Sequence, residues 1–296
     1  MPQAILEWAE DLLGDEIIEA VSQPGGFSPG TADIVRTVGD KRAFIKAAGI
    51  ELNELTPDIH RNEARISAAL PPSTALPQMI ASYDDGDWVA LAFDVIDGEP
   101  PALPWTRADI HAALDACLVL RAIEAPPGLR PFGEAVGGYR LSWRRLLDSP
   151  EPLPVDLEPD AIATLTALAG RDPGVEGDSL LHVDLRADNV LLRSDGSAVI
   201  VDWPWAATGA PWIDPLCLLF NVLLFDSGYP VEEELRHPAF DGAMPEAIDS
   251  LLAILCGFFL GQSVLPAQKG VESVRAFQRD QALAILGWLR SRGAVP

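Results

Sequence analysis

Apolar and polar residues alternate in several short runs near the start of the chain, a pattern typical of half-buried β-strands. The turn residues Gly39-Asp40 and Asp85-Gly86 each separate two such runs. Helical spacing marks the N-terminus, with Ile5, Trp8, Ala9 and Leu12 on one face, and a later stretch that ends at Pro71-Pro72. We therefore expect strands over 17–23, 31–38, 42–49, 79–85 and 88–96, and a long helix over 58–70.

The pattern changes near residue 98, where the Pro-rich stretch DGEPPALPW is followed mostly by helical periodicity. This change predicts a small N-terminal lobe over 1–97, built from an antiparallel sheet and one long helix. A hinge near 94–104 then leads to a larger, mostly helical lobe over 98–296. The expected fold class is α+β, in two lobes.

Charge and composition narrow the choice of partner and compartment. The formal net charge is −23, and so acidic a surface disfavours nucleic acid and anionic membranes as partners. The longest apolar run, LLAILCGFFLG (251–261), is too short to span a bilayer, and the N-terminus lacks the basic region of a signal peptide. Cys117, Cys217 and Cys256 are widely spaced in apolar contexts, which predicts buried free thiols. We expect a cytoplasmic protein.

A predicted hairpin carries candidate metal ligands at its open end. The runs VLLRS (190–194) and SAVIV (197–201) flank Asp195-Gly196, a pair that favours a two-residue hairpin loop. That loop would place Asn189 opposite Asp202, with Cβ atoms about 4.5–5.5 Å apart. An amide oxygen and a carboxylate at that spacing suit Mg²⁺, although both residue types also simply end strands.

The segment HVDLRADN precedes this hairpin, and it has the H-x-D-x-x-x-x-N spacing of a phosphoryl-transfer loop. In such chemistry a carboxylate, here Asp184, orients an attacking hydroxyl and accepts its proton. Asn189 and Asp202 hold Mg²⁺, and Arg186 offsets charge on the transferred phosphoryl group. His182 stands in an apolar run and is expected to pack under the loop.

These residues resemble the aminoglycoside phosphotransferase and related small-molecule kinase family, which shares the protein-kinase fold. That family commonly reads HGDxxxxN, followed by a hairpin and Asp-Trp or Asp-Phe; here the chain reads HVDLRADN and then VIVDW, with Val183 in place of Gly. The resemblance implies that Asp184 is the catalytic base and that Asn189 and Asp202 bind Mg²⁺. It further implies ATP or GTP as the phosphoryl donor and a small-molecule hydroxyl as the acceptor.

A kinase-like small lobe also needs groups that bind the nucleotide. The loop PGGFSPG (24–30) lies between two predicted strands, and backbone N–H groups of Gly26, Phe27, Ser28 and Gly30 are candidate phosphate donors, although a plain turn is the alternative. Lys46 falls on the same side of its strand as Phe44, which favours an inward position. Glu63 is its best helical partner, ahead of Glu51 and Glu54; the resemblance implies the family's ion pair, and an exposed helix carboxylate is the alternative.

Asp214 begins the stretch DPLCLL, where it is expected to cap a helix with Pro215 at the first position. In the family a matching Asp braces the catalytic loop, and the two roles are compatible. Residues 203–213 are too few for a long activation segment between Asp202 and Asp214. We therefore expect no protein substrate.

Two other functions compete with the kinase interpretation. Residues 26–30 match the G-x-S-x-G motif of serine hydrolases, but Pro29 has no N–H for an oxyanion and a strand follows where a helix is needed. The motif is therefore rejected. A nucleotide-binding pseudokinase would lack the base, a metal ligand or the strand Lys, and all of these are present.

The acceptor is the least determined part of this prediction. An aminoglycoside or another sugar-like molecule is the leading candidate, with homoserine, choline or a macrolide as alternatives. Trp205 and Trp212 would stack on an acceptor or simply pack. Five acidic residues could hold ammonium groups or form a solvated helix face, namely Asp226, Glu232, Glu233, Glu234 and Asp241.

Overall fold

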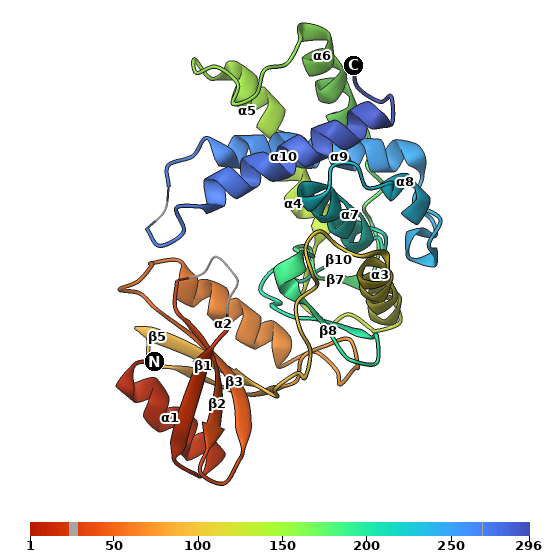
Figure 1. Cartoon of the computed structure of the whole chain (residues 1–296). Coiled ribbons are helices and arrows are strands. Elements are labelled where there is room, and N and C mark those ends of the chain that lie inside the picture. Colours follow the sequence, from red (N-terminus) through yellow and green to blue (C-terminus); the bar gives the residue numbers. More distant parts are fainter. Residues whose placement is uncertain (24–28, 268) are drawn as a thin grey trace.

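The computed structural model describes residues 1–23, 29–267 and 269–296 (Figure 1). An N-terminal region carries most of the strands and a larger region carries most of the helices. The helices are α1 Gln3–Leu13, α2 Thr56–Ser67, α3 Arg107–Arg121, α4 Phe132–Tyr139, α5 Ser142–Asp148, α6 Pro159–Ala169, α7 Ile213–Phe225, α8 Val231–Glu234, α9 Pro245–Ser263 and α10 Val274–Ser291, with short 3₁₀ turns at Ala187–Asn189 and Pro238–Phe240. The strands are β1 Ile17–Ser22, β2 Thr31–Thr37, β3 Arg42–Gly49, β4 Met79–Asp84, β5 Trp88–Phe93, β6 Arg130–Pro131, β7 Ser179–Leu181, β8 Val190–Leu192, β9 Ala198–Ile200 and β10 Ala207–Gly209.

A five-stranded antiparallel sheet, in the order β1-β2-β3-β5-β4, forms the N-terminal region. Its two faces follow the alternation of the sequence. Ala43, Ile45 and Ala47 pack under α1, while Phe44 and Lys46 of the same strand point to the opposite side. Helix α2 lies on that opposite side, where its Ala64 contacts the sheet (Figure 1). The predicted α+β chain with an antiparallel sheet is confirmed.

The segment after β5 ties the sheet to the helical region. Glu99 forms an antiparallel bridge with Leu192 of β8, with N···O distances of 3.0 and 2.8 Å. A Cβ atom at Gly98 would lie 2.9 Å from the carbonyl oxygen of Leu192, so the chain needs glycine at this crossing. The connector is therefore packed against β8 rather than being a free linker.

The helical region is built around α9 and α10, which lie side by side in Figure 1. Trp143 of α5 is buried against α9, and its indole donates to the carbonyl oxygen of Ala253 at 2.8 Å. Helix α9 is long and apolar enough to cross a membrane by composition alone, with mean hydropathy 1.3. However, 56% of the 18-residue window that meets this criterion is buried inside the protein. Cys117, Cys217 and Cys256 are buried and free, which confirms the prediction made for them.

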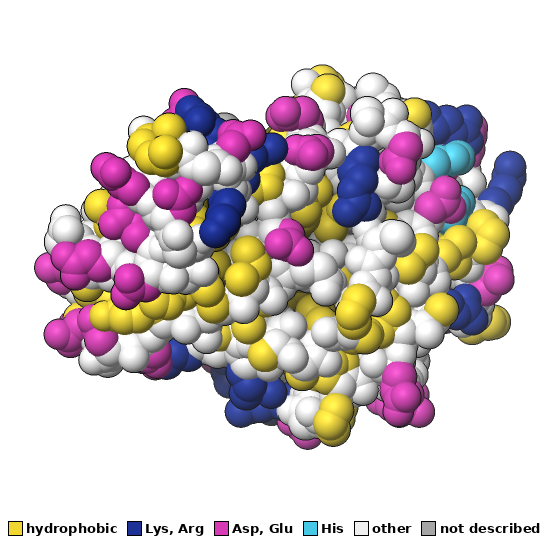
Figure 2. Space-filling view, turned by 90° about the horizontal axis from the view of Figure 1, so that it is seen from below, with side chains coloured by type: hydrophobic (Ala, Val, Ile, Leu, Met, Phe, Trp, Pro, Cys, Tyr) yellow, Lys and Arg dark blue, Asp and Glu magenta, His cyan; other side chains and the backbone are white. Residues whose placement is uncertain are grey.

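Acidic side chains are spread over the face shown in Figure 2, as the net charge of −23 leads one to expect. Apolar side chains lie between them on the same face. On this face the acidic side chains are therefore scattered rather than gathered in one patch.

Candidate active site

A cleft of about 1760 Å³ is lined by the sheet and α2 on one side and by α4, α7, α9 and α10 on the other. Most of the site residues predicted from the sequence line it: Gly30, Lys46, Glu63, Asp184, Arg186, Asn189 and Asp202. His182 and Asp214 are buried outside the cleft lining. Gly26, Phe27 and Ser28 lie outside the described residues.

Asp214 holds the turn that leads into Asp184. Its two carboxylate oxygens accept hydrogen bonds from the backbone N–H groups of His182, at 2.6 Å, and Val183, at 2.8 Å. His182 is fully buried, and its Nε2 donates to the carbonyl oxygen of Val201 at 2.9 Å. The turn is thus anchored from below by one carboxylate and one imidazole.

Asp214 does not cap its helix as predicted. Helix α7 begins at Ile213, with Trp212 at the N-cap, so Asp214 lies in the first turn and Pro215 is not the first helical residue. The N-cap prediction is wrong because the carboxylate is directed to backbone donors of another segment instead.

Val183 adopts a left-handed backbone conformation, with φ +73°. A β-branched residue is rare in this region, because its Cβ crowds the backbone, and the conformation costs about 1–2 kcal/mol. This strain explains why glycine suits the position. The turn nevertheless forms with Val183. The Val183 N–H is donated to Asp214, which helps to hold the strained turn.

The hairpin after the loop differs from the prediction by one residue of register. Arg193 pairs with Ser197, and a three-residue loop joins the strands, with Gly196 at φ +84°. Asn189 is therefore next to Val201, whose N–H it accepts at 2.9 Å, and the predicted pairing with Asp202 is wrong. Asp-Gly fits the three-residue loop because Gly takes its left-handed position.

Asp202 lines the cleft although it does not pair with Asn189. Its backbone has φ +67°, a left-handed conformation that Asp tolerates better than most residues. Its carboxylate is 2.5 Å from the Lys46 Nζ, and its side chain keeps 40% exposure. Burial opposes ionisation of Asp202, but Lys46 outweighs it and lowers the pKa of the carboxyl.

Asn189 is buried and oriented by the loop that carries Asp184. Its Nδ2 donates to the backbone carbonyl oxygen of Asp184 at 2.8 Å. That contact fixes the amide so that Oδ1 is the side-chain atom available to a cation. Asn189 and Asp202 together offer oxygen ligands of the kind that Mg²⁺ prefers. Among the described residues no group of three His, Cys, Asp or Glu forms a metal site, so a metal here would need further ligands from water and phosphate.

The Asp184 carboxylate has the electrostatic environment of a base. Burial raises its pKa to about 6, although Arg186 acts in the opposite direction. The Nη1 atom of Arg186 lies 3.5 Å from Asp184 Oδ2, and 31% of the Asp184 side chain stays exposed to the cleft. Asp184 is thus ionised at neutral pH, yet close enough to neutrality to accept a proton.

Asp188 is a neighbour of Arg186 that the sequence analysis did not single out. It receives two hydrogen bonds from Arg186, Nε at 3.1 Å and Nη2 at 2.9 Å. The guanidinium also lies over the ring of Phe277, 5.4 Å from its centroid. The spacing R-x-D was visible in the sequence, but the side-chain pairing depends on the 3₁₀ turn that follows Arg186.

Lys46 stands between two carboxylates at the sheet side of the cleft. Its ammonium forms ion pairs with Glu63 of α2 and with Asp202. Glu63 is 2% exposed, and burial raises its pKa to about 7 in spite of Lys46. Burial would lower the pKa of Lys46, but Asp202 and Glu63 together raise it, so the ammonium stays charged.

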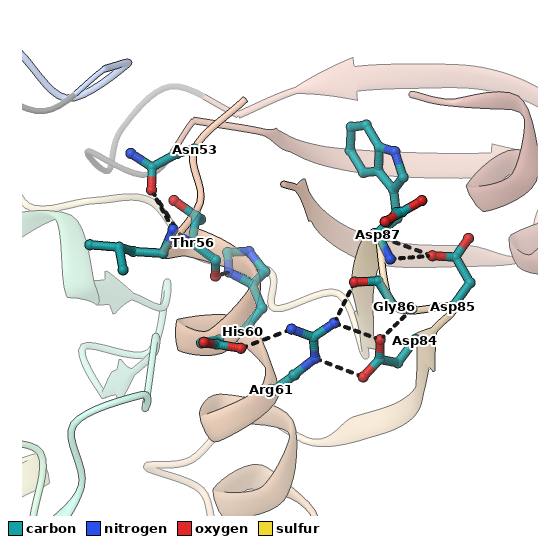
Figure 3. Close-up of polar contacts among 11 residues, drawn as sticks. Asn53, Thr56, His60, Arg61, Asp84, Asp85, Gly86 and Asp87 are labelled. Carbon is teal, nitrogen blue, oxygen red and sulfur yellow. Dashed lines mark hydrogen bonds and ion pairs between the residues drawn. The ribbon is translucent and has the colours of Figure 1, made fainter. Parts of the chain in front are cut away.

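Arg61 joins α2, the helix that carries Glu63, to the end of β4 and the turn after it (Figure 3). It makes two parallel hydrogen bonds of 2.9 Å to Asp84, at the end of β4, and donates to the carbonyl oxygen of Gly86 at 2.9 Å. At the start of the helix, Asn53 Oδ1 accepts the N–H of Thr56 at 3.2 Å. This contact helps α2 to start at Thr56, two residues earlier than predicted. The helix ends at Ser67, before Pro71-Pro72.

Gly30 has a steric reason of its own to be glycine. A Cβ atom there would lie 2.2 Å from the backbone carbonyl oxygen of Ala47. The residue lines the cleft, where its N–H remains a candidate phosphate donor.

The acidic residues suggested for an acceptor are outside the cleft. Three contact other side chains: Glu232 contacts Arg292 at 2.7 Å, Glu233 contacts Arg107 at 3.5 Å and Glu234 contacts His111 at 2.7 Å. None of the five lines the cleft, so the idea that they hold an acceptor is wrong: Asp226, Glu232, Glu233, Glu234 and Asp241. Trp212 is buried in the core, whereas Trp205 is 52% exposed and does line the cleft.

Comparison with known proteins gives a family match and several similar folds. A family model described as "Phosphotransferase enzyme family" matches residues 31–250. The structure is similar to macrolide 2′-phosphotransferase from Brachybacterium faecium, with a TM-score of 0.60, 16% identity and 96% of each chain covered. It is also similar to choline kinase from Streptococcus pneumoniae, with a TM-score of 0.58, 16% identity and coverage of 96% of this chain and 98% of that one.

A third similar structure is a thermostable mutant of aminoglycoside phosphotransferase APH(4)-Ia in a ternary complex with ADP and hygromycin B. Its TM-score is 0.57, its identity 14%, and the coverage is 96% of this chain and 98% of that one. No curated protein matches the chain. At these identities the three structures establish a kinase-like fold.

Proposed function

The chain belongs to the phosphotransferase enzyme family, and from this premise we propose that it transfers the γ-phosphoryl group of ATP or GTP to a hydroxyl of a small molecule, with Mg²⁺. One observation carries the proposal: Lys46, Asp184, Asn189 and Asp202 all line one cleft. These are the residue types that phosphoryl transfer requires. A nucleotide bound in a similar fold, in the complex with ADP and hygromycin B, supports the same conclusion.

Asp184 would act as the base. With a pKa of about 6 it is mostly ionised at pH 7, and its exposed carboxylate can orient an acceptor hydroxyl toward the γ-phosphorus. The acceptor oxygen forms a bond to phosphorus while the bond between phosphorus and the β–γ bridging oxygen breaks. The proton passes to Asp184, and the products are a phosphate monoester and the nucleoside diphosphate.

Asn189 and Asp202 would hold the magnesium ion. Their oxygen atoms fit this hard cation, which when bound offsets charge on the phosphates. The Asp184 carbonyl oxygen accepts the Asn189 amide hydrogen and so orients the amide, while Lys46 keeps Asp202 ionised. Both residues are thus prepared as ligands by neighbours within the chain.

The sheet side would bind the nucleotide. Lys46, held by Glu63, supplies the charge for the phosphates. The stretch 24–30 would contribute backbone N–H groups; of its candidates Gly26, Phe27, Ser28 and Gly30, only Gly30 belongs to the described part of the chain. Arg186 would stabilise the transferred group, with Asp188 orienting its guanidinium. In this proposal, residues 1–97 and 98–296 form two lobes that meet at the cleft.

The proposal also concerns the setting of the enzyme. Three buried free thiols support a reducing cytoplasm, and a net charge of −23 disfavours nucleic acid and anionic membranes as partners. The short stretch 203–213 supports a small molecule, rather than a protein, as the acceptor.

The experiment is acceptor-dependent release of ADP or GDP in Mg²⁺ buffer, with a panel of hydroxyl compounds and with Asp184→Asn as the matched control. We expect release that vanishes in Asp184→Asn while that variant still binds Mg·ADP. Binding of Mg·ADP without release for every acceptor would support a pseudokinase instead. Absence of both would contradict the proposal.

A further inference from the structure

A row of aromatic rings runs along the helical wall of the cleft. It passes from α4 through α9 to α7, and each ring contacts the next. The centroid distances are 6.5 Å for Phe132–Tyr139, 4.0 Å for Tyr139–Phe258, 5.2 Å for Phe258–Phe259 and 5.9 Å for Phe259–Phe220. All five side chains line the cleft. Tyr139, Phe258 and Phe259 are partly exposed, whereas Phe132 and Phe220, at the two ends of the row, are buried. We call these five rings the aromatic wall.

The aromatic wall lies beside the proposed base. Cys217, one turn before Phe220 on α7, lines the cleft, and its Sγ is 4.0 Å from the carbonyl oxygen of Val183. Burial raises the pKa of the Tyr139 phenol, and the charge of Asp184 adds to this effect. Because Val183 directly precedes Asp184, the α7 end of the wall lies next to the loop that carries Asp184.

The wall carries little charge although the chain has 44 acidic residues. The cleft-lining residues of α4, α7, α9 and α10 include one acid, Glu134, and one base, Arg275. Their remaining polar members are amides, namely Gln262, Gln278 and Gln281. A polycationic aminocyclitol needs several carboxylates around it, and this surface does not offer them.

The arrangement of the rings also matters. They meet pairwise in tilted or edge contacts, one after another along a row. A cage for a quaternary ammonium instead presents several faces to one point. The wall is better suited to an extended apolar surface, with the glutamines as hydrogen-bond partners for its oxygen atoms.

We propose, resting on the phosphotransferase function above, that the acceptor is an uncharged, predominantly apolar molecule that carries hydroxyl groups. The partly exposed rings of the aromatic wall, Tyr139, Phe258 and Phe259, bind its apolar face, and Gln262 and Gln278 bind its polar groups. This assignment differs from the aminoglycoside that the sequence favoured.

The test measures binding to the protein loaded with Mg·ADP, so it does not depend on turnover. The probes are two amine-free alcohols, the macrolactone erythronolide B and the steroid pregnenolone, together with hygromycin B and choline. We expect at least one of the alcohols to bind tenfold or more tightly than both cations. Tighter binding of hygromycin B or choline would overturn the inference.

Two variants tie the binding to the wall. Phe258→Ala should weaken binding of the alcohol about tenfold, because apolar contact is lost. Phe225→Ala is the control: Phe225 does not line the cleft, so its replacement should leave the affinity unchanged. Gln262→Glu should weaken binding of the alcohol and strengthen binding of choline or hygromycin B. Unchanged Mg·ADP affinity shows that each variant is folded, and unchanged alcohol affinity in Phe258→Ala and Gln262→Glu would contradict the inference.

Phosphoryl transfer is measured separately on the same samples. If an alcohol binds at the wall but no acceptor is phosphorylated in an Asp184-dependent manner, the proposed function fails while the binding preference stands. If transfer occurs and the cations are the better substrates, the proposed function stands and the apolar acceptor fails.

Discussion

The two sides of the cleft hold their charged groups in different ways. On the helical side, Asp184 and Asn189 stand on a loop whose backbone is tied to Asp214 and His182 by hydrogen bonds. On the sheet side, Lys46 is held by ion pairs to carboxylates from two different elements. The loop therefore keeps its shape through hydrogen bonds in which one partner is a backbone group, whereas the sheet side depends on charge balance between side chains.

This difference between the two sides predicts which substitutions lower the unfolding free energy most and which make it depend on pH. Breaking the sheet side leaves a buried charge without its partner, which is expensive. Breaking the loop side leaves backbone donors without acceptors, which costs less for each group.

Lys46→Met should have the largest effect on stability. It leaves Glu63 buried without its cation, and loss of one partner of a buried pair costs about 3–5 kcal/mol. The pKa of Glu63, already about 7, rises further without Lys46. A carboxyl whose folded-state pKa exceeds its unfolded value opposes folding as the pH rises. The destabilisation, measured by urea unfolding, should thus be greater at pH 9 than at pH 5.

The matched control is Lys46→Met combined with Glu63→Gln, which removes the buried unpaired charge; Asp202, the other partner of Lys46, has 40% side-chain exposure and stays in contact with water. Most of the stability should return, and its dependence on pH should flatten. If the double variant is as unstable as the single one and keeps its pH dependence, charge balance does not stabilise the sheet side of the cleft.

Asp214→Ala should destabilise the protein by about 3 kcal/mol. The substitution leaves the N–H groups of His182 and Val183 without the carboxylate, and a hydrogen bond to a charged group contributes about 1.5–3 kcal/mol. Asp214→Asn retains an acceptor and should cost about half as much. Equal unfolding free energies for wild type and Asp214→Ala would show that the loop does not need this brace.

Val183→Gly and Val183→Ala separate strain from packing at one position. Both remove the half-buried Val side chain, but only Gly relieves the left-handed conformation at φ +73°. Gly should therefore be more stable than Ala here by about 1 kcal/mol, the reverse of their usual order. Chemical denaturation of the two variants measures the difference, and a more stable Ala variant would contradict the assigned strain.

Arg61→Ala should have the smallest effect. Its side chain is 34% exposed, and exposed ion pairs contribute at most about 1 kcal/mol even with good geometry. We therefore expect the unfolding free energy to fall by about 0.5–1 kcal/mol. Arg65→Ala on the same helix is the control, and a larger loss for Arg65 than for Arg61 would show that the Asp84 contact does not fix α2.

Much of the fold and part of the site followed from local sequence patterns. Alternation along β3 placed Lys46 beside Phe44 on the cleft side, and the spacing from His182 to Asn189 identified the loop. The hairpin register did not follow, because Asp195-Gly196 fits loops of two and three residues equally.

The remaining misses share a physical cause, which is pairing between distant segments. Nothing near Glu232 in the sequence indicates Arg292, and nothing near Asp84 indicates Arg61. The aromatic wall is also assembled from three helices, so its rings are far apart in sequence. Side-chain partners of this kind depend on the tertiary structure and are not encoded in local spacing.

The most direct test of Asp184 as the base is the pH dependence of kcat/KM for phosphoryl transfer, once an acceptor is identified. We expect the rate to fall as the pH drops through about 6, where protonation removes the carboxylate, and to level off above pH 7. Asp184→Asn should lose about 10²–10⁴-fold in kcat/KM and show no such step. A flat profile in the wild type, or an unchanged rate in Asp184→Asn, would contradict the role of Asp184.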